Sequence, residues 1–423
     1  MLYERWRQIA QLDPSRIALR DLVSNRQWTF RELALATERI VPDGGKIAFP
    51  QGASAEFIFS VLQAWRAGHI VCPLEVGRTP PEISRGLPPE IVHLKTTSAT
   101  TGPPRLVAMT AAQLMADAEN IVTTMGLRPD WPNLGVVSLA HSYGFSNLVL
   151  PLLLHGIPLI LADAPLPEVV QKAAKCADLV TLAAVPALWR AWLDADAIPR
   201  NVRLAISAGA ALPLALEHGV FAARGLKIHN FYGSSECGGI AYDATSGPRT
   251  DASCAGAPMH NVQLSVGGDG CLQVRSGAVG ETYWPEPGAA LANGVFHTAD
   301  IAEISYGFVY LRGRASDQIN VAGRKVSPET IEKILLAHPQ VRDCLVFGAP
   351  STDEERSEKI VACVVAKSPV TGETLKQFLL AKLPGWQIPR EWRFVETLEA
   401  DRRGKLSRME WRRKYLAAPH DAC

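Results

Sequence analysis

The sequence predicts an α/β protein with a large N-terminal domain of parallel-rich sheets flanked by helices, a β-rich subdomain and a small α+β C-terminal domain. Helical and strand patterns alternate as far as residue 238. Short strands separated by turns follow, and a second series of helix and strand patterns begins near residue 314. In a chain of 423 residues, these changes of pattern indicate two domains.

Five segments carry the alternation in the first part of the chain. Residues 55–68 have helical periodicity, and 69–75 form an apolar strand pattern. Residues 177–193 predict a strand and then a helix. Residues 202–210 predict a strand ending in small residues, and 226–236 a strand that runs into a polar loop.

Such βαβ units place their strands in parallel, and ligands then collect beyond the carboxyl ends of the strands. The loops at Ser98, Ala208 and Ser234 each follow a predicted strand. We therefore expect these three loops at ligand-binding edges of the sheets.

The C-terminal elements follow from turn and capping signals. A Gly-Asp-Gly turn predicts a hairpin within 262–277, and 307–314 is a strand pattern. A helix over 327–340 begins with Ser327 as N-cap and Pro328 at the first position. Strands at 341–350, 359–367 and 390–398 and a helix at 374–383 complete the small domain.

Composition gives no bulk electrostatic basis for binding a polyanion. Forty-three basic and 42 acidic side chains leave a formal charge of +1. That balance provides no general attraction to nucleic acid or to an anionic membrane, so we expect neither as a partner. A charged ligand must be bound by a local site.

The cysteines and the apolar segments indicate a cytoplasmic protein. Eight dispersed cysteines without a CxxC pair argue against structural zinc and against a disulfide scaffold. The first residues carry charges and lack the apolar stretch of a secretory signal. The longest apolar run, 148–162, is short for a membrane span and is interrupted by prolines, so it predicts a buried helix end, a turn and a buried strand.

The segment TTSATTGPPRLVAMT, residues 96–110, gathers small hydroxyl side chains, a glycine and two prolines around Arg105. Hydroxyl and backbone N–H donors beside a basic residue suit a phosphate. Taken alone, the cluster is equally the composition of a polar surface turn.

Four segments in order resemble the motif series of the adenylate-forming superfamily, which includes acyl-CoA synthetases, aryl-acid adenylating enzymes, nonribosomal peptide adenylation domains and luciferases. They are 96–110, NFYGSSE at 230–236, HTAD at 297–300 with GRASDQINVAGRKVSPETIE at 313–332, and RRGKLSR at 402–408. The resemblance spans nearly the whole chain. It implies a ligase that converts a carboxylic acid and MgATP to acyl-AMP and pyrophosphate, and then passes the acyl group to a thiol.

The resemblance also implies residue roles around the nucleotide. Glu236 would carry Mg²⁺, and Tyr232 would stack on adenine. Ser235 would lie beside the α-phosphate, while Asp300 would bind the ribose hydroxyls and Arg314 would add a ribose or phosphate contact. The other implied nucleotide contacts are Thr97, Ser98, Thr100, Thr101, Gly102 and Arg105 at the β- and γ-phosphates, with Ala208, Gly209, Gly233 and Ser234 in the small-residue loops.

Lys405, with Glu236 and Arg105, completes the implied catalytic set, because the family's C-terminal lysine contacts the carboxylate and the α-phosphate. The resemblance places domains at 1–313 and 317–423, joined by a hinge at 314–316 that includes Ser316. Rotation about this hinge would make the small domain mobile, replacing Lys405 with the Gly323 loop to admit the thiol. Read alone, Lys405 is a surface lysine.

The acid-binding segment of the family matches residues 139–149, LAHSYGFSNLV, which contain no acidic residue. Amino-acid-activating members carry an aspartate there, so the resemblance favours an aryl or other non-amino acid. His141, Phe145, Gly209 and Phe231 are the expected substrate-pocket residues, although His141 is also consistent with a packed histidine.

The resemblance implies that the acceptor is the thiol of CoA or of the phosphopantetheine of an acyl carrier protein. Arg324 and Lys325 could meet the CoA nucleotide or an acidic carrier.

Several positions depart from the family pattern. Ala99 and Ala299 replace glycines, Arg105 replaces a lysine, Glu399 replaces a proline, and the chain before the phosphate loop is short. These departures keep open a nucleotide-binding protein without turnover, or a ligase with an acceptor other than a thiol.

Overall fold

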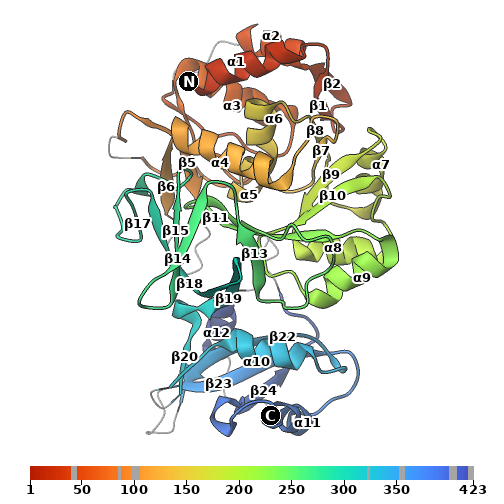
Figure 1. The fold of residues 1–423 in the computed structure, drawn as a ribbon, viewed down its shortest axis with the longest axis vertical. Coiled ribbons are helices and arrows are strands. Elements are labelled where there is room, and N and C mark those ends of the chain that lie inside the picture. The colour runs from red at the N-terminus through yellow and green to blue at the C-terminus, as the bar shows by residue number, and fades with distance from the viewer. Residues whose placement is uncertain are drawn as a thin grey trace.

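The computed structural model describes residues 1–39, 45–83, 87–97, 105–321, 324–351, 358–399 and 407–417. It confirms the predicted fold class: a large sheet-rich N-terminal domain lies above a smaller C-terminal domain in Figure 1.

The main sheet has a parallel half whose strands are short apolar runs, as expected for strands covered on both faces. Every residue of β9 (Val180–Ala184), for example, is buried. The parallel half contains, in spatial order, β11 (Ile228–Ser234), β10 (Val202–Ser207), β9, β7 (Asn133–Gly135), β8 (Leu159–Leu161) and β1 (Ile17–Asp21), with antiparallel β2 (Arg26–Thr29) at the edge.

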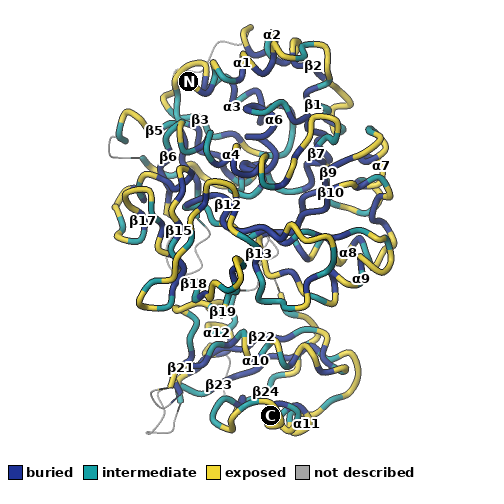
Figure 2. Tube along the Cα trace, viewed as in Figure 1, coloured by how far each residue is buried: buried dark blue, intermediate teal, exposed yellow. Residues whose placement is uncertain are grey.

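Helices cover both faces of this half, so the central strands are buried in Figure 2. On one face, the apolar sides of α7 (Pro167–Ala174), α8 (Pro186–Asp194) and α9 (Leu214–Arg224) pack around Trp189 and Trp192. The larger core on the other side includes α1 (Leu2–Leu12), α2 (Phe30–Arg39), α3 (Ala55–Ala67), α4 (Ala111–Met125), α5 (Ser142–Gly144), the π-helical turn η1 (Phe145–Val149) and α6 (Leu150–His155).

The other half of the main sheet is antiparallel and forms the predicted β-rich part. The Gly-Asp-Gly turn is confirmed as a hairpin, with Val266 paired to Leu272. Its strands are β12 (Gly238–Tyr242), β13 (Cys254–Pro258), β14 (Val262–Val266), β15 (Cys271–Ser276), β17 (Leu291–Ala292), β18 (Val295–Ser305) and β19 (Phe308–Arg314).

A second sheet carries the segment around the predicted phosphate loop. Its order is β16 (Thr282–Trp284), β6 (Leu106–Thr110), β5 (Ile91–Thr96), β4 (Ile70–Val71) and β3 (Ile47–Ala48). The Ser98 loop was expected after a strand of a βαβ unit, but β5 and β6 are antiparallel neighbours. The connection is therefore a hairpin, although β5 itself runs parallel to β4.

The small domain has a three-stranded sheet of β22 (Val341–Pro350), β23 (Glu358–Ala366) and β24 (Glu391–Phe394). The strand pair β20 (Ile319–Val321) and β21 (Arg324–Val326) precedes it. The helices are α10 (Pro328–Leu336), α11 (Gly372–Leu380) and α12 (Arg408–Ala417), and the 3₁₀ turns are η2 (Ala315–Asp317) and η3 (Gly385–Gln387).

Three local predictions need correction. The strand predicted over 69–75 is reduced to β4 before Pro73. The strand predicted over 390–398 ends at Phe394. The helix predicted over 327–340 ends at Leu336; Ser327 is its N-cap residue, as predicted, but the Ser327 hydroxyl makes no capping hydrogen bond and lies 3.0 Å from the Arg312 carbonyl and 2.6 Å from Glu329.

The segment 148–162 forms the end of η1, α6, a turn and β8, which confirms its prediction. No helix within the described ranges is both long and apolar enough to cross a membrane. Of the eight cysteines, the seven that the structure describes are free thiols, and Cys423 lies outside.

One arginine binds three carboxylates in the small domain. Arg408, at the start of α12, pairs with Asp317 at 3.0 Å, Glu329 at 2.7 Å and Glu332 at 2.6 Å. Glu332 also accepts the Val346 N–H at 2.7 Å. Burial raises the pKa of Glu332 to about 7, although Arg408 opposes that shift.

We expect this group to make stability depend on pH. Because the pKa of Glu332 is raised in the folded state, the folded protein binds this proton more tightly than the unfolded chain does. The contribution of Glu332 to the free energy of unfolding is therefore fully present below pH 4.5, the usual pKa of a glutamate, and is lost as the pH rises through about 7. Glu332→Gln should abolish that loss. Melting temperatures of both proteins between pH 4.5 and pH 8 would measure it, and parallel curves would contradict the prediction. Glu168→Gln, on an exposed position of α7, is the control.

Candidate active site

The carboxyl ends of β10 and β11 bring two predicted loops together. The strands are parallel and in register, with Ser207 beside Asn230. Ala208 follows β10 and is buried, and its N–H donates to the Ala184 carbonyl at 3.2 Å. Gly209 is exposed with a φ of +85°, a conformation that favours glycine. The small-residue loop is therefore held at the sheet edge beside the end of β11.

The turn between β11 and β12 is compact. A Cβ on Gly233 would lie 2.7 Å from the Gly238 carbonyl oxygen, so this position admits only glycine. The Ser234 hydroxyl lies 3.3 Å from the Cys237 sulfur. The Ser235 hydroxyl accepts a hydrogen bond from Ser142 at 2.7 Å, which joins the turn to α5.

Asp300 connects three strands at one side of this turn. Its Oδ2 accepts a hydrogen bond of 2.5 Å from the Tyr232 hydroxyl on β11, and its Oδ1 accepts one of 2.9 Å from Nε of Arg314 on β19. The Asp300 N–H donates to the Thr298 hydroxyl at 3.1 Å. The three residues predicted for adenine and ribose are thus in direct contact.

Glu236 is held at the other end of the turn by the segment before and within β16. The Gly280 N–H donates to the Glu236 carbonyl at 2.8 Å, and the Tyr283 hydroxyl donates to its carboxylate at 3.2 Å. The Arg105 guanidinium lies 5.4 Å from the centre of the Tyr283 ring. The predicted metal ligand and the predicted phosphate cation thus flank one tyrosine.

Two of these tyrosines are firmly protonated. Burial, and then the charge of Asp300, raises the pKa of Tyr232 well above its usual value of 10. Burial and the charge of Glu236 likewise raise the pKa of Tyr283. Both hydroxyls therefore remain hydrogen-bond donors to carboxylates at neutral pH.

The segment predicted to bind the carboxylic acid, residues 139–149, lies against β11. Tyr143 packs its ring 5.9 Å from that of Phe231, and its hydroxyl donates to the Ala184 carbonyl at 3.5 Å. The half-buried His141 accepts a hydrogen bond from the Tyr143 N–H, at 3.4 Å, as the N-cap of α5.

Phe145 was expected in the substrate pocket, but only 1% of its surface is exposed. Its ring packs 4.4 Å from His93 and 6.4 Å from Phe57 in the core. Phe145 therefore packs on the core side of the acid-binding segment. Ser142 and Tyr143, which are half-buried, contribute exposed surface in the same segment.

The base of the phosphate loop is closed by two predicted residues. The Thr97 N–H and hydroxyl donate to the Arg105 carbonyl at 2.9 and 3.1 Å, and the Thr97 hydroxyl accepts from the Arg105 N–H at 3.1 Å. In this structure Thr97 thus joins the two ends of the loop. Ser98, Thr100, Thr101 and Gly102, as well as Ala99, Gly323 and Lys405, lie outside the described residues.

Ser316, the predicted hinge, lies in the exposed turn η2 between β19 and β20. Its hydroxyl donates to the adjacent Asp317 at 3.2 Å. Between the small and the large domain, Lys333 of α10 forms an ion pair of 2.9 Å with Asp251.

Sequence reasoning missed Ser142, Tyr283 and Thr298, which position the predicted residues. Thr298 carried a signal, because it belongs to the HTAD segment. Tyr283 lies 47 positions from Glu236 and carried none.

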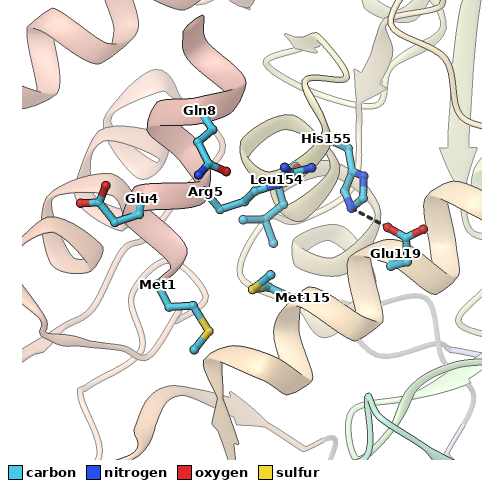
Figure 3. A pocket seen from close by; sticks show the side chains of 8 residues that line it. All are labelled: Met1, Glu4, Arg5, Gln8, Met115, Glu119, Leu154 and His155. Carbon is cyan, nitrogen blue, oxygen red and sulfur yellow. Dashed lines mark hydrogen bonds and ion pairs between the residues drawn. The ribbon is translucent and has the colours of Figure 1, made fainter. Parts of the chain in front are cut away.

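A cavity of about 430 Å³ lies elsewhere, between α1, α4 and α6 (Figure 3). It is lined by Met1, Glu4, Arg5, Gln8, Met115, Glu119, Leu154 and His155. None of the residues predicted for nucleotide or acid lines it.

The chain matches two family models. Residues 85–294 match the AMP-binding enzyme model, and residues 330–405 match the AMP-binding enzyme C-terminal domain. A 2-succinylbenzoate–CoA ligase of Bacillus cereus is 28% identical over 333 residues, which cover 75% of this chain and 68% of that protein. A feruloyl-CoA synthase of an Amycolatopsis species is 27% identical over 357 residues, covering 79% and 72%.

Solved structures share the whole fold. ATP-bound MatB from Rhodopseudomonas palustris has a TM-score of 0.85 at 19% identity, covering 98% of this chain and 99% of that one. O-succinylbenzoate coenzyme A synthetase from Bacillus subtilis, in complex with AMP, has a TM-score of 0.81 at 22% identity, covering 96% and 97%. The solved structures show the fold, and the family models together with the sequence relatives show that the chain belongs to the AMP-binding enzymes of the adenylate-forming superfamily, among the AMP-forming acid–thiol ligases.

Proposed function

We propose that this protein uses ATP to convert a small aryl carboxylic acid to acyl-AMP and pyrophosphate, and then transfers the acyl group to the thiol of coenzyme A. One observation carries the proposal. Tyr232 at the end of β11 is assigned to adenine, and Ser235 and Glu236 in the turn that follows are assigned to the α-phosphate and the metal. Each of the three is held by a hydrogen bond to a residue of another segment.

The nucleoside would lie on the Asp300 side. Tyr232 and Arg314 hold the Asp300 carboxylate in one orientation, and a fixed carboxylate can accept both ribose hydroxyls. With the ribose there, the phosphates would extend along the turn toward Glu236 and Arg105.

Glu236 fits a Mg²⁺ ion bound together with the phosphates. No group of three or more His, Cys, Asp or Glu side chains is placed to hold a metal within the described part of the chain. Mg²⁺ commonly uses one or two carboxylates and completes its shell with phosphate oxygens and water, so a single half-buried carboxylate suffices. When bound, the ion would neutralise phosphate charge.

The chain's own residues would align the two reactants. An acid carboxylate beside the Ser142–Ser235 pair would attack the α-phosphorus, forming the acyl–phosphate bond as pyrophosphate leaves. Arg105 would stabilise the departing pyrophosphate, and we assign Lys405 to the charge that develops at the α-phosphate. In the second step the thiol loses its proton to solvent and its sulfur attacks the acyl carbonyl, so that a C–S bond forms and AMP leaves with the electrons of the acyl–oxygen bond.

An aryl acid is favoured by the relatives and by the residues near the turn. The two relatives above are named for 2-succinylbenzoate and ferulate, both aromatic acids. In this chain the Tyr143–Phe231 ring pair provides an aromatic wall, and residues 139–149 contain no acid to bind an amino group.

Coenzyme A is the proposed acceptor because both relatives are CoA ligases. The phosphopantetheine of a carrier protein presents the same thiol and is the alternative. Arg324 and Lys325, both exposed on β21, could receive the phosphates of either.

We expect acid-dependent ATP–pyrophosphate exchange with benzoates or cinnamates, and little with amino acids. Lys405→Ala should lower the exchange by about 100-fold or more, because it removes charge stabilisation at the α-phosphate. Mass spectrometry after addition of CoA or of a phosphopantetheinylated carrier would identify the acceptor. Silence with every acid, in a protein that still binds ATP, would contradict the proposed turnover.

Tyr232→Phe tests the nucleoside end separately. Loss of the hydrogen bond to the Asp300 carboxylate should raise the KM for ATP about tenfold, since such a bond contributes about 1.5–3 kcal/mol. The KM for the acid should stay nearly constant. Tyr306→Phe makes the same change on a tyrosine that is 98% exposed and serves as control. An unchanged KM for ATP would show that the bond does not orient Asp300 for binding.

A further inference from the structure

A buried carboxylate lies beneath the proposed site. Asp117 of α4 is fully buried, and its Oδ2 accepts hydrogen bonds from the Ser146 hydroxyl at 2.6 Å and the Lys95 ammonium at 3.0 Å. The ammonium also donates to Ser146 at 3.2 Å. The Lys95 side chain is only 1% exposed, so this ion pair is shielded from water.

Each partner of Asp117 belongs to a different part of the proposed site. Lys95 lies in β5, two positions before Thr97, which closes the phosphate loop. Ser146 lies in η1, within the acid-binding segment 139–149. One carboxylate thus joins the helix α4 to two segments that have separate roles in the proposed reaction.

The third segment is the Glu236 turn, which Asp117 contacts through Gly238. A Cβ on Gly238 would lie 2.0 Å from Asp117 Oδ1, so the carboxylate is packed directly against the backbone of this residue. Gly238 has a φ of +68° and begins β12, two positions after Glu236. The Asp117 carboxylate therefore limits how far the turn can move inward.

Burial energetics indicate that this pair contributes more to geometry than to stability. A buried ion pair loses its hydration, and replacement by a neutral pair of similar shape is often close to neutral in stability. Its hydrogen bonds are directional, however, and apolar contacts would allow the three segments to slide. None of the functional roles assigned above uses Lys95, Asp117 or Ser146.

We propose that Asp117 and Lys95 are positioning residues of the adenylation step, which hold β5 at the base of the phosphate loop, the acid-binding segment and the Glu236 turn in mutual register. This inference rests on the proposed function. The pair acts through the backbone of these segments and contacts no substrate. Its effect should be largest on the chemistry that involves the triphosphate, because two of the three segments are assigned to the phosphates and their metal.

The test uses the paired variant Lys95→Met/Asp117→Asn. It removes both charges together, so neither is left buried without a partner, and the asparagine can still accept the Ser146 hydrogen bond. We expect a melting temperature close to that of the wild type. We expect the rate of ATP–pyrophosphate exchange to fall by about tenfold or more, since misplacement of reacting groups is costly.

A second half-reaction separates positioning from a merely structural role. Thioester formation from supplied acyl-AMP involves neither pyrophosphate nor the γ-phosphate, and it should fall less than threefold in the paired variant. Leu33→Ala, at a fully buried position of α2, is the destabilised control and should affect both half-reactions alike. Equal losses in the paired variant, or wild-type exchange, would overturn the inference.

Calorimetric titration with MgATP keeps the two proposals distinguishable. If the wild type binds MgATP but exchanges with no acid, the proposed function fails on its own. The paired variant should still bind MgATP at least about fivefold more weakly than the wild type. Equal affinity in the two proteins would then overturn the positioning role.

Discussion

The parallel pairing of β10 with β11 is the constraint on which the proposed site depends. β10 ends at Ser207, which lies beside Asn230 of β11. β11 runs in the same direction and extends four residues further, to Ser234. The chain then folds back as β12, so a single hairpin presents the residues assigned to adenine, the α-phosphate and the metal. A shift of register by one residue would turn Tyr232 away from Asp300.

Asp300 extends this constraint to the small domain. It pairs with Arg314 both in the β18–β19 ladder and through its side chain, and Ser316 follows two positions later. Two contacts connect α10 and its N-cap to the large domain: Ser327 donates to the Arg312 carbonyl, and Lys333 pairs with Asp251. A ribose bound to Asp300 would therefore act on the strand that leads into the proposed hinge.

Local pattern was sufficient for most of the fold but not for the support of the site. Periodicity predicts α3, α10 and β22, because each buries one face or both within its own segment. The motifs are contiguous, so Tyr232, Ser235 and Glu236 could be identified without knowing the fold. Phe145 was expected in the substrate pocket, but it is buried among core residues at the start of the π-helical turn, a placement that tertiary packing decides and local pattern does not show. Lys95 and Asp117 lie 22 positions apart and resemble surface charges in sequence, since burial of an ion pair is decided by tertiary packing.

The packing around Tyr283 gives a physical reason for arginine at position 105. The guanidinium is planar and weakly hydrated, so it can lie over the Tyr283 ring. A lysine would place a compact, strongly hydrated charge there instead. The same tyrosine donates its hydroxyl to Glu236, so the ring links the predicted phosphate cation to the predicted metal ligand. Before ATP binds, the two opposite charges are thus held on either side of one protonated side chain. The contact with the Tyr283 ring therefore gives a local packing reason for arginine at position 105, and under the proposed function both groups would lie near the departing pyrophosphate.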